Sequence, residues 1–116
     1  NEENMLKTLE SANERWGWTR GNFSWNYPSL ALNATRLGRP DIAVRAVNMN
    51  GRSDLLLPSG NNYRSTTLRM YLPGNGGILL AVGMMCAGWD GCTEENPGFP
   101  KDGTWDVRWE GLKPMP

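Results

Sequence analysis

The sequence predicts a mainly α fold built of helical hairpins and followed by a short β segment. Apolar residues recur at helical spacing over residues 3–15, 27–37 and 40–48, and a nearly continuous apolar run covers 77–88. Residues 105–109 alternate aromatic or apolar residues with charged ones, which is typical of a strand. We therefore expect helical hairpins over 1–90 and a Pro- and Gly-rich segment with a terminal strand over 91–116.

Residues 37–41 predict a tight link between two of these helices. Gly38 suits the left-handed turn that ends a helix, and Pro40 suits the first turn of the next one. Asp41 interacts favourably with the N-terminal dipole of that second helix. Helices joined by so short a link must run antiparallel, so we expect an αα-hairpin.

The helix expected over residues 77–88 has almost no polar side. A helix that is apolar all round is buried on every side. The other expected elements can cover two of its faces, so we expect further helices from a longer chain or from a second chain. The chain begins at Asn1 rather than at Met, and we expect it to be a processed or trimmed part of a longer protein.

Composition excludes several classes of function. The 116 residues carry 12 basic and 12 acidic side chains, and this zero balance argues against a nucleic-acid partner. The longest apolar stretch, Ile78–Ala87, is too short to cross a membrane. The chain has no histidine, which excludes Ser-His-Asp and Cys-His catalysis within it and all histidine-based metal sites. We expect no metal and no cofactor.

The two cysteines and two glycosylation sequons predict a secreted or extracytoplasmic protein. Five residues with two glycines separate Cys86 from Cys92, so the chain can turn back and a short-loop disulfide is expected. The alternative is a buried free thiol on the helix and an exposed one after it. Asn22 and Asn33 each begin an Asn-x-Ser/Thr sequon, and Asn22, in an expected loop, is the better candidate for glycosylation.

The six tryptophans offer flat faces that suit sugar rings, so carbohydrate is a candidate ligand, although composition alone favours core packing for each single tryptophan. Residues 49–75 are expected to form a long loop with little secondary structure of its own, and such loops are usually functional. The Gly74-Asn75-Gly76-Gly77 turn is expected to open a helix with free N–H groups. The alternatives are core packing for the tryptophans and ordinary turn chemistry for the amides and glycines. The candidate substrate-binding residues are Trp18, Arg20, Trp25, Asn61, Asn62, Tyr63 and Asn75.

Several segments together resemble the six-hairpin glycosidase-like proteins. The resemblance covers about residues 14–114 and is carried by the order and spacing of Trp16-Gly17-Trp18, Trp25-Asn26-Tyr27-Pro28, Ala34-Thr35-Arg36-Leu37-Gly38-Arg39-Pro40, Leu57-Pro58-Ser59-Gly60-Asn61-Asn62-Tyr63, Tyr71-Leu72-Pro73-Gly74-Asn75-Gly76-Gly77, Phe99-Pro100-Lys101-Asp102-Gly103-Thr104-Trp105 and Val107-Arg108-Trp109-Glu110-Gly111-Leu112.

The resemblance implies the C-terminal part of an (α/α)6 toroid in a chain several times longer, similar to glycoside hydrolase family 95 and its clan. Those enzymes hydrolyse a glycosidic bond by inversion, with paired acids or with a base aided by amides. The general acid would lie upstream of Asn1. Pro73 stands where the family pattern has an Asp, and Asn26 stands where related sequences often have an acid. No catalytic residue is therefore assigned.

Three functions compete at this point. The chain is expected to be the C-terminal portion of a glycoside hydrolase that is not active alone. The alternatives are a non-catalytic carbohydrate-binding domain and a scaffold domain without a sugar site. Convergence of Trp18, Trp25, Asn62 and Asn75 on one concave surface would favour the two carbohydrate functions over the scaffold.

Overall fold

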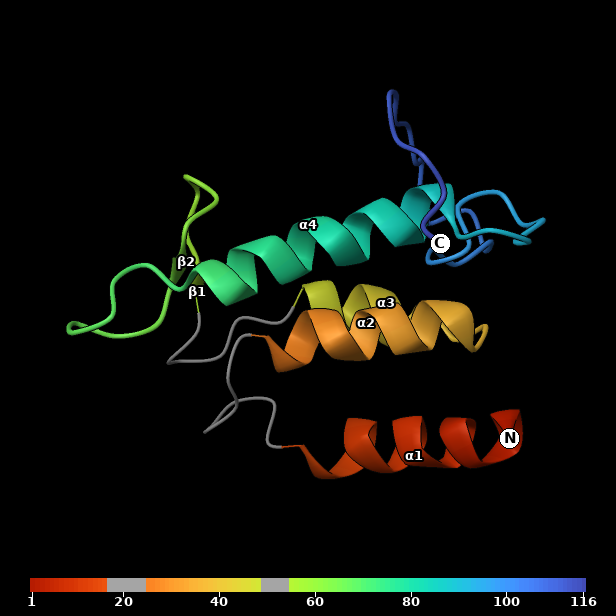
Figure 1. Cartoon of the computed structure of the whole chain (residues 1–116), viewed down its shortest axis with the longest axis horizontal. Helices are drawn as coiled ribbons and strands as arrows, with labels where there is room; N and C mark the ends of the chain where they lie inside the picture. Colours follow the sequence, from red (N-terminus) through yellow and green to blue (C-terminus); the bar gives the residue numbers. More distant parts are fainter. Residues whose placement is uncertain (17–24, 49–54) are drawn as a thin grey trace.

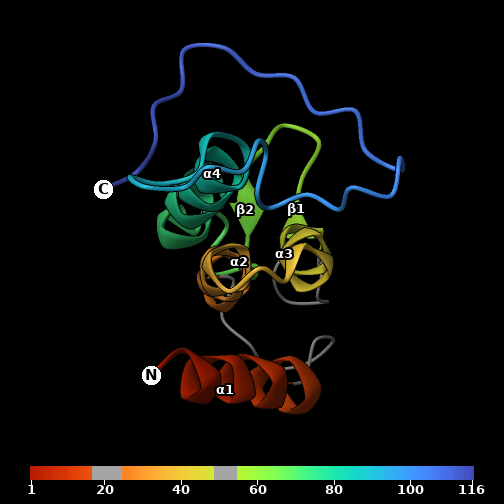
Figure 2. The same ribbon diagram turned by 90° about the vertical axis from the view of Figure 1, so that its right-hand side faces the viewer.

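The computed structural model describes residues 1–16, 25–48 and 55–116, and it confirms a mainly α fold. Four helices pack together in this part of the chain, with α2 and α3 lying between α1 and α4 (Figures 1 and 2). The only other regular structure there is a two-residue antiparallel pair of strands. The elements are α1 (Glu2–Arg15), α2 (Asn26–Arg36), α3 (Pro40–Val47), β1 (Leu55–Leu56), β2 (Asn62–Tyr63) and α4 (Leu72–Ala87).

The predicted αα-hairpin is formed by α2 and α3. Gly38 adopts a left-handed conformation with φ of 65°, as expected for the residue that ends α2. The backbone N–H of Arg39 donates to the carbonyl of Ala34 at 2.8 Å, and that of Gly38 donates to Thr35 at 3.3 Å. These two bonds satisfy carbonyls that the end of α2 would leave unpaired, and they turn the chain sharply into Pro40 at the start of α3.

The core lies where α2, α3 and α4 meet. Small side chains on α2 and α3 let these two helices approach closely. Gly77 of α4 touches Pro28 of α2, because a Cβ at Gly77 would lie 2.6 Å from Pro28 Cγ. α2 and α4 begin at the same end of the molecule, whereas α1 and α3 run the opposite way (Figure 1). The buried cluster comprises Leu9, Leu30, Ala31, Ala34, Ile42, Ala43, Ala46, Ala81, Met85, Cys86 and Phe99.

Helix α1 is attached to the rest by a narrow apolar stripe and an ion pair. Leu9 is its buried residue, and Leu6, Ala12 and the following Trp16 pack half-buried against the core. Arg39, between α2 and α3, donates to Glu10 of α1 at 2.8 Å and also binds Asp41 at 2.8 Å.

The Arg39–Asp41 contact predicts a small acid-dependent loss of stability. The hydrogen bond from Arg39 holds the pKa of Asp41 below its ordinary value. The contact therefore contributes stability above the unfolded-state pKa of about 3.9, and this stability is lost as the pH falls through the lower folded-state pKa. Both side chains are partly exposed, so we expect less than about 1 kcal/mol. Urea unfolding at neutral and acid pH should show the effect, and Asp41→Asn should remove it.

Helix α4 differs from the prediction in two ways. It begins at Leu72 rather than near residue 77, so the glycine-rich stretch lies within its first turns and is not a turn before it. It is also not buried on every side, because Leu79 is 76% and Leu80 52% exposed. Within the described residues, α2 and α3 cover one side of α4 and Gly98 packs on its last turn, but the side that carries Leu79 and Leu80 stays uncovered.

The strand expected at Trp105–Trp109 is absent. A strand needs a neighbour for its hydrogen bonds, and in the described part of the chain residues 105–109 pair with no other strand. The segment runs out from the end of α4 in a wide loop (Figure 2) and returns so that Met115 forms an isolated parallel bridge with Trp89. Phe99, which lies between α4 and residues 105–109, packs into the helical core. The division at residue 90 stays a prediction.

Candidate functional site

The residues predicted to bind carbohydrate fall into three groups according to their place in the structure. Trp18, Arg20 and the sequon residue Asn22 lie outside the described residues. Trp25 is the N-cap residue of α2 and is 53% exposed. Asn61, Asn62, Tyr63 and Asn75 gather where the β1–β2 turn meets the start of α4, and their geometry can be followed atom by atom.

The amides of this cluster are hydrogen-bonded to the backbone. Asn75 Oδ1 accepts from the N–H of Asn62 at 2.9 Å, and Asn75 Nδ2 donates to the carbonyl of Gly60. Asn61 Nδ2 donates to the carbonyl of Arg69 at 2.9 Å. Asn62 is 2% exposed and its carbonyl accepts from Tyr71 N–H at 2.8 Å. These bonds tie the β1–β2 turn to α4.

The glycine-rich stretch also lacks the free N–H groups predicted for it at Gly74 and Asn75. Because the helix starts at Leu72, the N–H groups of both residues donate to the carbonyl of Tyr71, at 3.1 and 3.3 Å. Gly77 is instead required for the contact with Pro28. The prediction failed because Pro73 and three glycines have low helix propensity, whereas tertiary contacts stabilise the first turns of this helix.

Replacing Asn75 with alanine tests whether this cluster is structural. The change removes two hydrogen bonds worth about 1 kcal/mol each, so we expect the free energy of unfolding to fall by about 2 kcal/mol. Chemical denaturation followed by circular dichroism measures this. Asn48→Ala is the matched control, since Asn48 is exposed and, among the described residues, its side chain donates to Val44 of α3. Equal stability of the two variants would contradict a structural role for Asn75.

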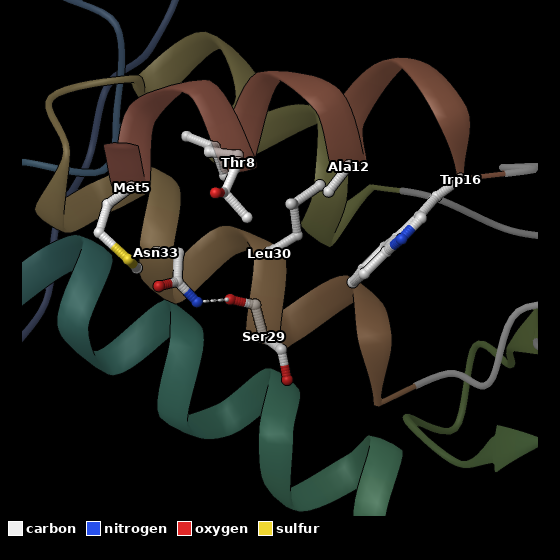
Figure 3. A pocket seen from close by; sticks show the side chains of 8 residues that line it. Met5, Thr8, Ala12, Trp16, Ser29, Leu30 and Asn33 are labelled. Carbon is white, nitrogen blue, oxygen red and sulfur yellow. Dashed lines mark hydrogen bonds between the residues drawn. The ribbon is translucent and has the colours of Figure 1, made fainter. Parts of the chain in front are cut away.

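An open hollow of about 200 Å³ lies between α1 and α2 (Figure 3). Its wall is mostly apolar. Two of its polar side chains are hydrogen-bonded within their own helices: Thr8 donates to the carbonyl of Asn4, and Asn33 donates to the carbonyl of Ser29. It offers a surface for an apolar group but no acid or base for catalysis. The lining residues are Met5, Thr8, Leu9, Ala12, Trp16, Ser29, Leu30 and Asn33.

The second sequon lies on the wall of this hollow. Asn33 is exposed, but its Nδ2, the atom that would carry the glycan, donates to the carbonyl of Ser29 at 2.8 Å. Thr35 is buried, and its hydroxyl donates to the carbonyl of Ala31. A glycan at Asn33 would have to break the hydrogen bond from its Nδ2 to Ser29. Glycosylation at Asn22 and Asn33 stays a prediction.

The predicted disulfide between Cys86 and Cys92 is absent, and both residues are free thiols. Helix α4 directs Cys86 into the core, while the left-handed Gly88 turns the chain so that Cys92 packs over Gly88. The Cys92 thiol lies 3.8 Å from the carbonyl of Glu94, as a weak donor to it. This arrangement is the alternative that the sequence left open.

The two thiols are expected to react at different rates. Burial raises the pKa of Cys86 and so lowers its thiolate fraction, whereas Cys92 is only half-buried. A thiol reagent should label Cys92 in the folded protein and both cysteines after denaturation. Mass spectrometry of the labelled peptides distinguishes the two sites. Absence of labelling at either cysteine in the denatured, unreduced chain would contradict free thiols.

The described residues contain no assembled catalytic group. Asp90, Glu94, Glu95 and Glu110 are exposed, and no cluster of three or more potential metal ligands occurs in this part of the chain. None of its helices has the length and apolar character needed to span a bilayer. Sequence reasoning missed a hollow beside Trp105, because the alternation over 105–109 favoured a strand. Searches against family models, curated proteins and solved structures found no match to this chain.

Proposed function

We propose that this chain is the C-terminal helical part of a larger, secreted carbohydrate-active protein of the α/α-toroid type. Further helices, from the same chain or a second one, would pack against α4. The complete protein would hydrolyse glycosidic bonds, and its catalytic acids would lie outside this chain.

The uncovered side of α4 is the observation that carries the proposal. The helix has no charged residue in its 16 positions. Leu72, Leu79 and Leu80 are 65%, 76% and 52% exposed, although exposed apolar residues clustered on one helix usually mark a contact surface. Further helices would remove this surface from water.

The direction of the helices supports the same proposal. α2 and α4 are neighbours that begin at the same end, and α1 and α3 run the opposite way (Figure 1). In a toroid of helical hairpins, successive inner helices are likewise parallel and outer helices run against them. α2 and α4 would then be inner helices, and Trp25 would lie at the end where the inner helices begin.

A scaffold without a sugar site is the second candidate, and the amide network favours it. Asn61 and Asn75 are hydrogen-bonded to the backbone and Asn62 is buried, and these contacts support a structural role for the three amides. Packing of α4 against other helices is common to both candidates.

The intact mass of the protein from its natural source tests the proposal. We expect a mass several times the 12.9 kDa of this chain, with a further decrease on deglycosylation. A stable, folded and glycan-free species of 12.9 kDa would refute both the toroid and the secreted assignment. If the mass is large, paired acids in the additional sequence would favour the hydrolase, and their absence would favour the scaffold.

A further inference from the structure

A second hollow, of about 240 Å³, lies in the segment that follows α4. It is separate from the β1–β2 turn and from the space between α1 and α2, and it belongs to no predicted site. Its walls combine two aromatic rings with polar groups. The residues used below are Asn96, Phe99, Lys101 and Trp105, which all line it.

The aromatic wall is fixed at one side and open at the other. Phe99 is 8% exposed and belongs to the helical core. The ring of Trp105 packs against it with centroids 5.2 Å apart and planes inclined by 52°. Trp105 is nevertheless 41% exposed, so part of its indole surface is held in a defined place and remains open to solvent.

The polar side of the hollow is also held in place. Asn96 adopts φ of 49° in the left-handed region, and the Lys101 ammonium donates to the carbonyls of both Glu95 and Asn96. An ammonium has three N–H groups, so these two bonds leave one for a further acceptor. Asp102 accepts from the N–H and the hydroxyl of Thr104, which fixes the turn that leads into Trp105.

We propose that this hollow is a binding subsite for a single sugar ring. Trp105 would pack on the apolar C–H face of the ring, and the Lys101 ammonium would donate to one of its hydroxyls. A pre-arranged wall lowers the entropy lost on binding. An open hollow of this size fits one ring better than a proline-rich peptide, which requires an extended groove. The choice of a sugar rests on the proposed function, but the site itself needs only the described chain.

Binding can be measured on the isolated chain by NMR titration with millimolar methyl glycosides of common hexoses, pentoses and deoxyhexoses. We expect one class of glycoside to shift the indole N–H signal of Trp105, and Trp105→Ala to weaken its affinity at least tenfold. Trp105→Phe keeps a ring against Phe99 and is expected to lose less. Leu112→Ala is the matched control, because Leu112 is also a partly exposed apolar residue of the C-terminal segment but does not line the hollow.

Three outcomes would overturn the inference. They are the absence of any shift at Trp105 with every glycoside, unchanged affinity in both Trp105 variants, and a shift caused only by a polyproline peptide. The outcome is separate from that of the proposed function, which the intact mass decides. If the natural protein has a mass of 12.9 kDa and the isolated chain binds a sugar, the subsite is supported and the toroid is refuted.

Discussion

Replacing Gly98 with alanine is expected to lower the free energy of unfolding by about 3 kcal/mol. A Cβ at Gly98 would lie 2.6 Å from the Cα of Met85, which is backbone and cannot rotate away. Gly98 also donates its N–H to the carbonyl of Met85 at 3.0 Å, so the two segments cannot separate without losing this bond. Urea denaturation followed by circular dichroism measures the change.

Gly83→Ala is the matched control for this substitution. Gly83 lies within α4, and apart from its own helix no atom of the described residues lies within 4 Å of the position its Cβ would take. Alanine is favoured over glycine inside a helix, so the isolated chain should gain about 0.5–1 kcal/mol. Equal destabilisation by the two substitutions would show that Gly98 does not hold the C-terminal segment against α4 as described.

Replacing Leu79 with lysine is expected to keep the isolated chain folded and to reduce its self-association strongly. Leu79 is 76% exposed on the uncovered side of α4, so its removal should change the free energy of unfolding by less than about 0.5 kcal/mol. The same change places a charge in an apolar surface that would otherwise associate in water. Analytical ultracentrifugation over a range of concentrations compares the variant with the unaltered chain.

Ala81→Lys distinguishes the two sides of the same helix. Ala81 is completely buried, and an unpaired ammonium there should cost more than about 4 kcal/mol and prevent folding. If Leu79→Lys unfolds the chain as well, α4 is buried on both sides in solution. If the unaltered chain stays monomeric at high concentration, the apolar side of α4 does not associate by itself.

Local signals were sufficient to predict the α2–α3 hairpin from sequence. Gly38 and Pro40 have conformational preferences that hold in almost any surroundings, and the apolar periodicity on either side of them is helical. The first helix was predicted for the same reason. In these segments the local preferences and the final packing agree, which is the condition under which sequence reasoning succeeds.

Long-range contacts determine the parts that the sequence did not predict. The start of α4 depends on Gly77 meeting Pro28 and on the bonds of Asn75 to the β1–β2 turn, and neither contact is visible in a local pattern. The residue types at Trp105–Trp109 alternate as in a strand, but in the described part of the chain no neighbouring strand pairs with this segment. Propensity cannot supply a partner.

The candidate site shows the same limit at the level of single side chains. Asparagine occurs both in sugar sites and in turns, and the hydrogen bonds of these amides to Gly60, Arg69 and Asn62 could not be predicted from residue type. The sequence left open for a related reason whether the two cysteines form a disulfide. Spacing allows a disulfide, but the direction in which α4 presents Cys86 determines whether the two sulfur atoms can meet.

The thin attachment of α1 gives the chain unequal resistance to local opening. Leu9 and the Arg39–Glu10 pair hold α1 to a unit that α2, α3 and α4 form among themselves. Detaching α1 therefore costs less free energy than unfolding the whole, and it leaves the α2–α3 hairpin intact. Hydrogen exchange should begin in α1, and α1 is the helix that two copies of the chain could most readily exchange.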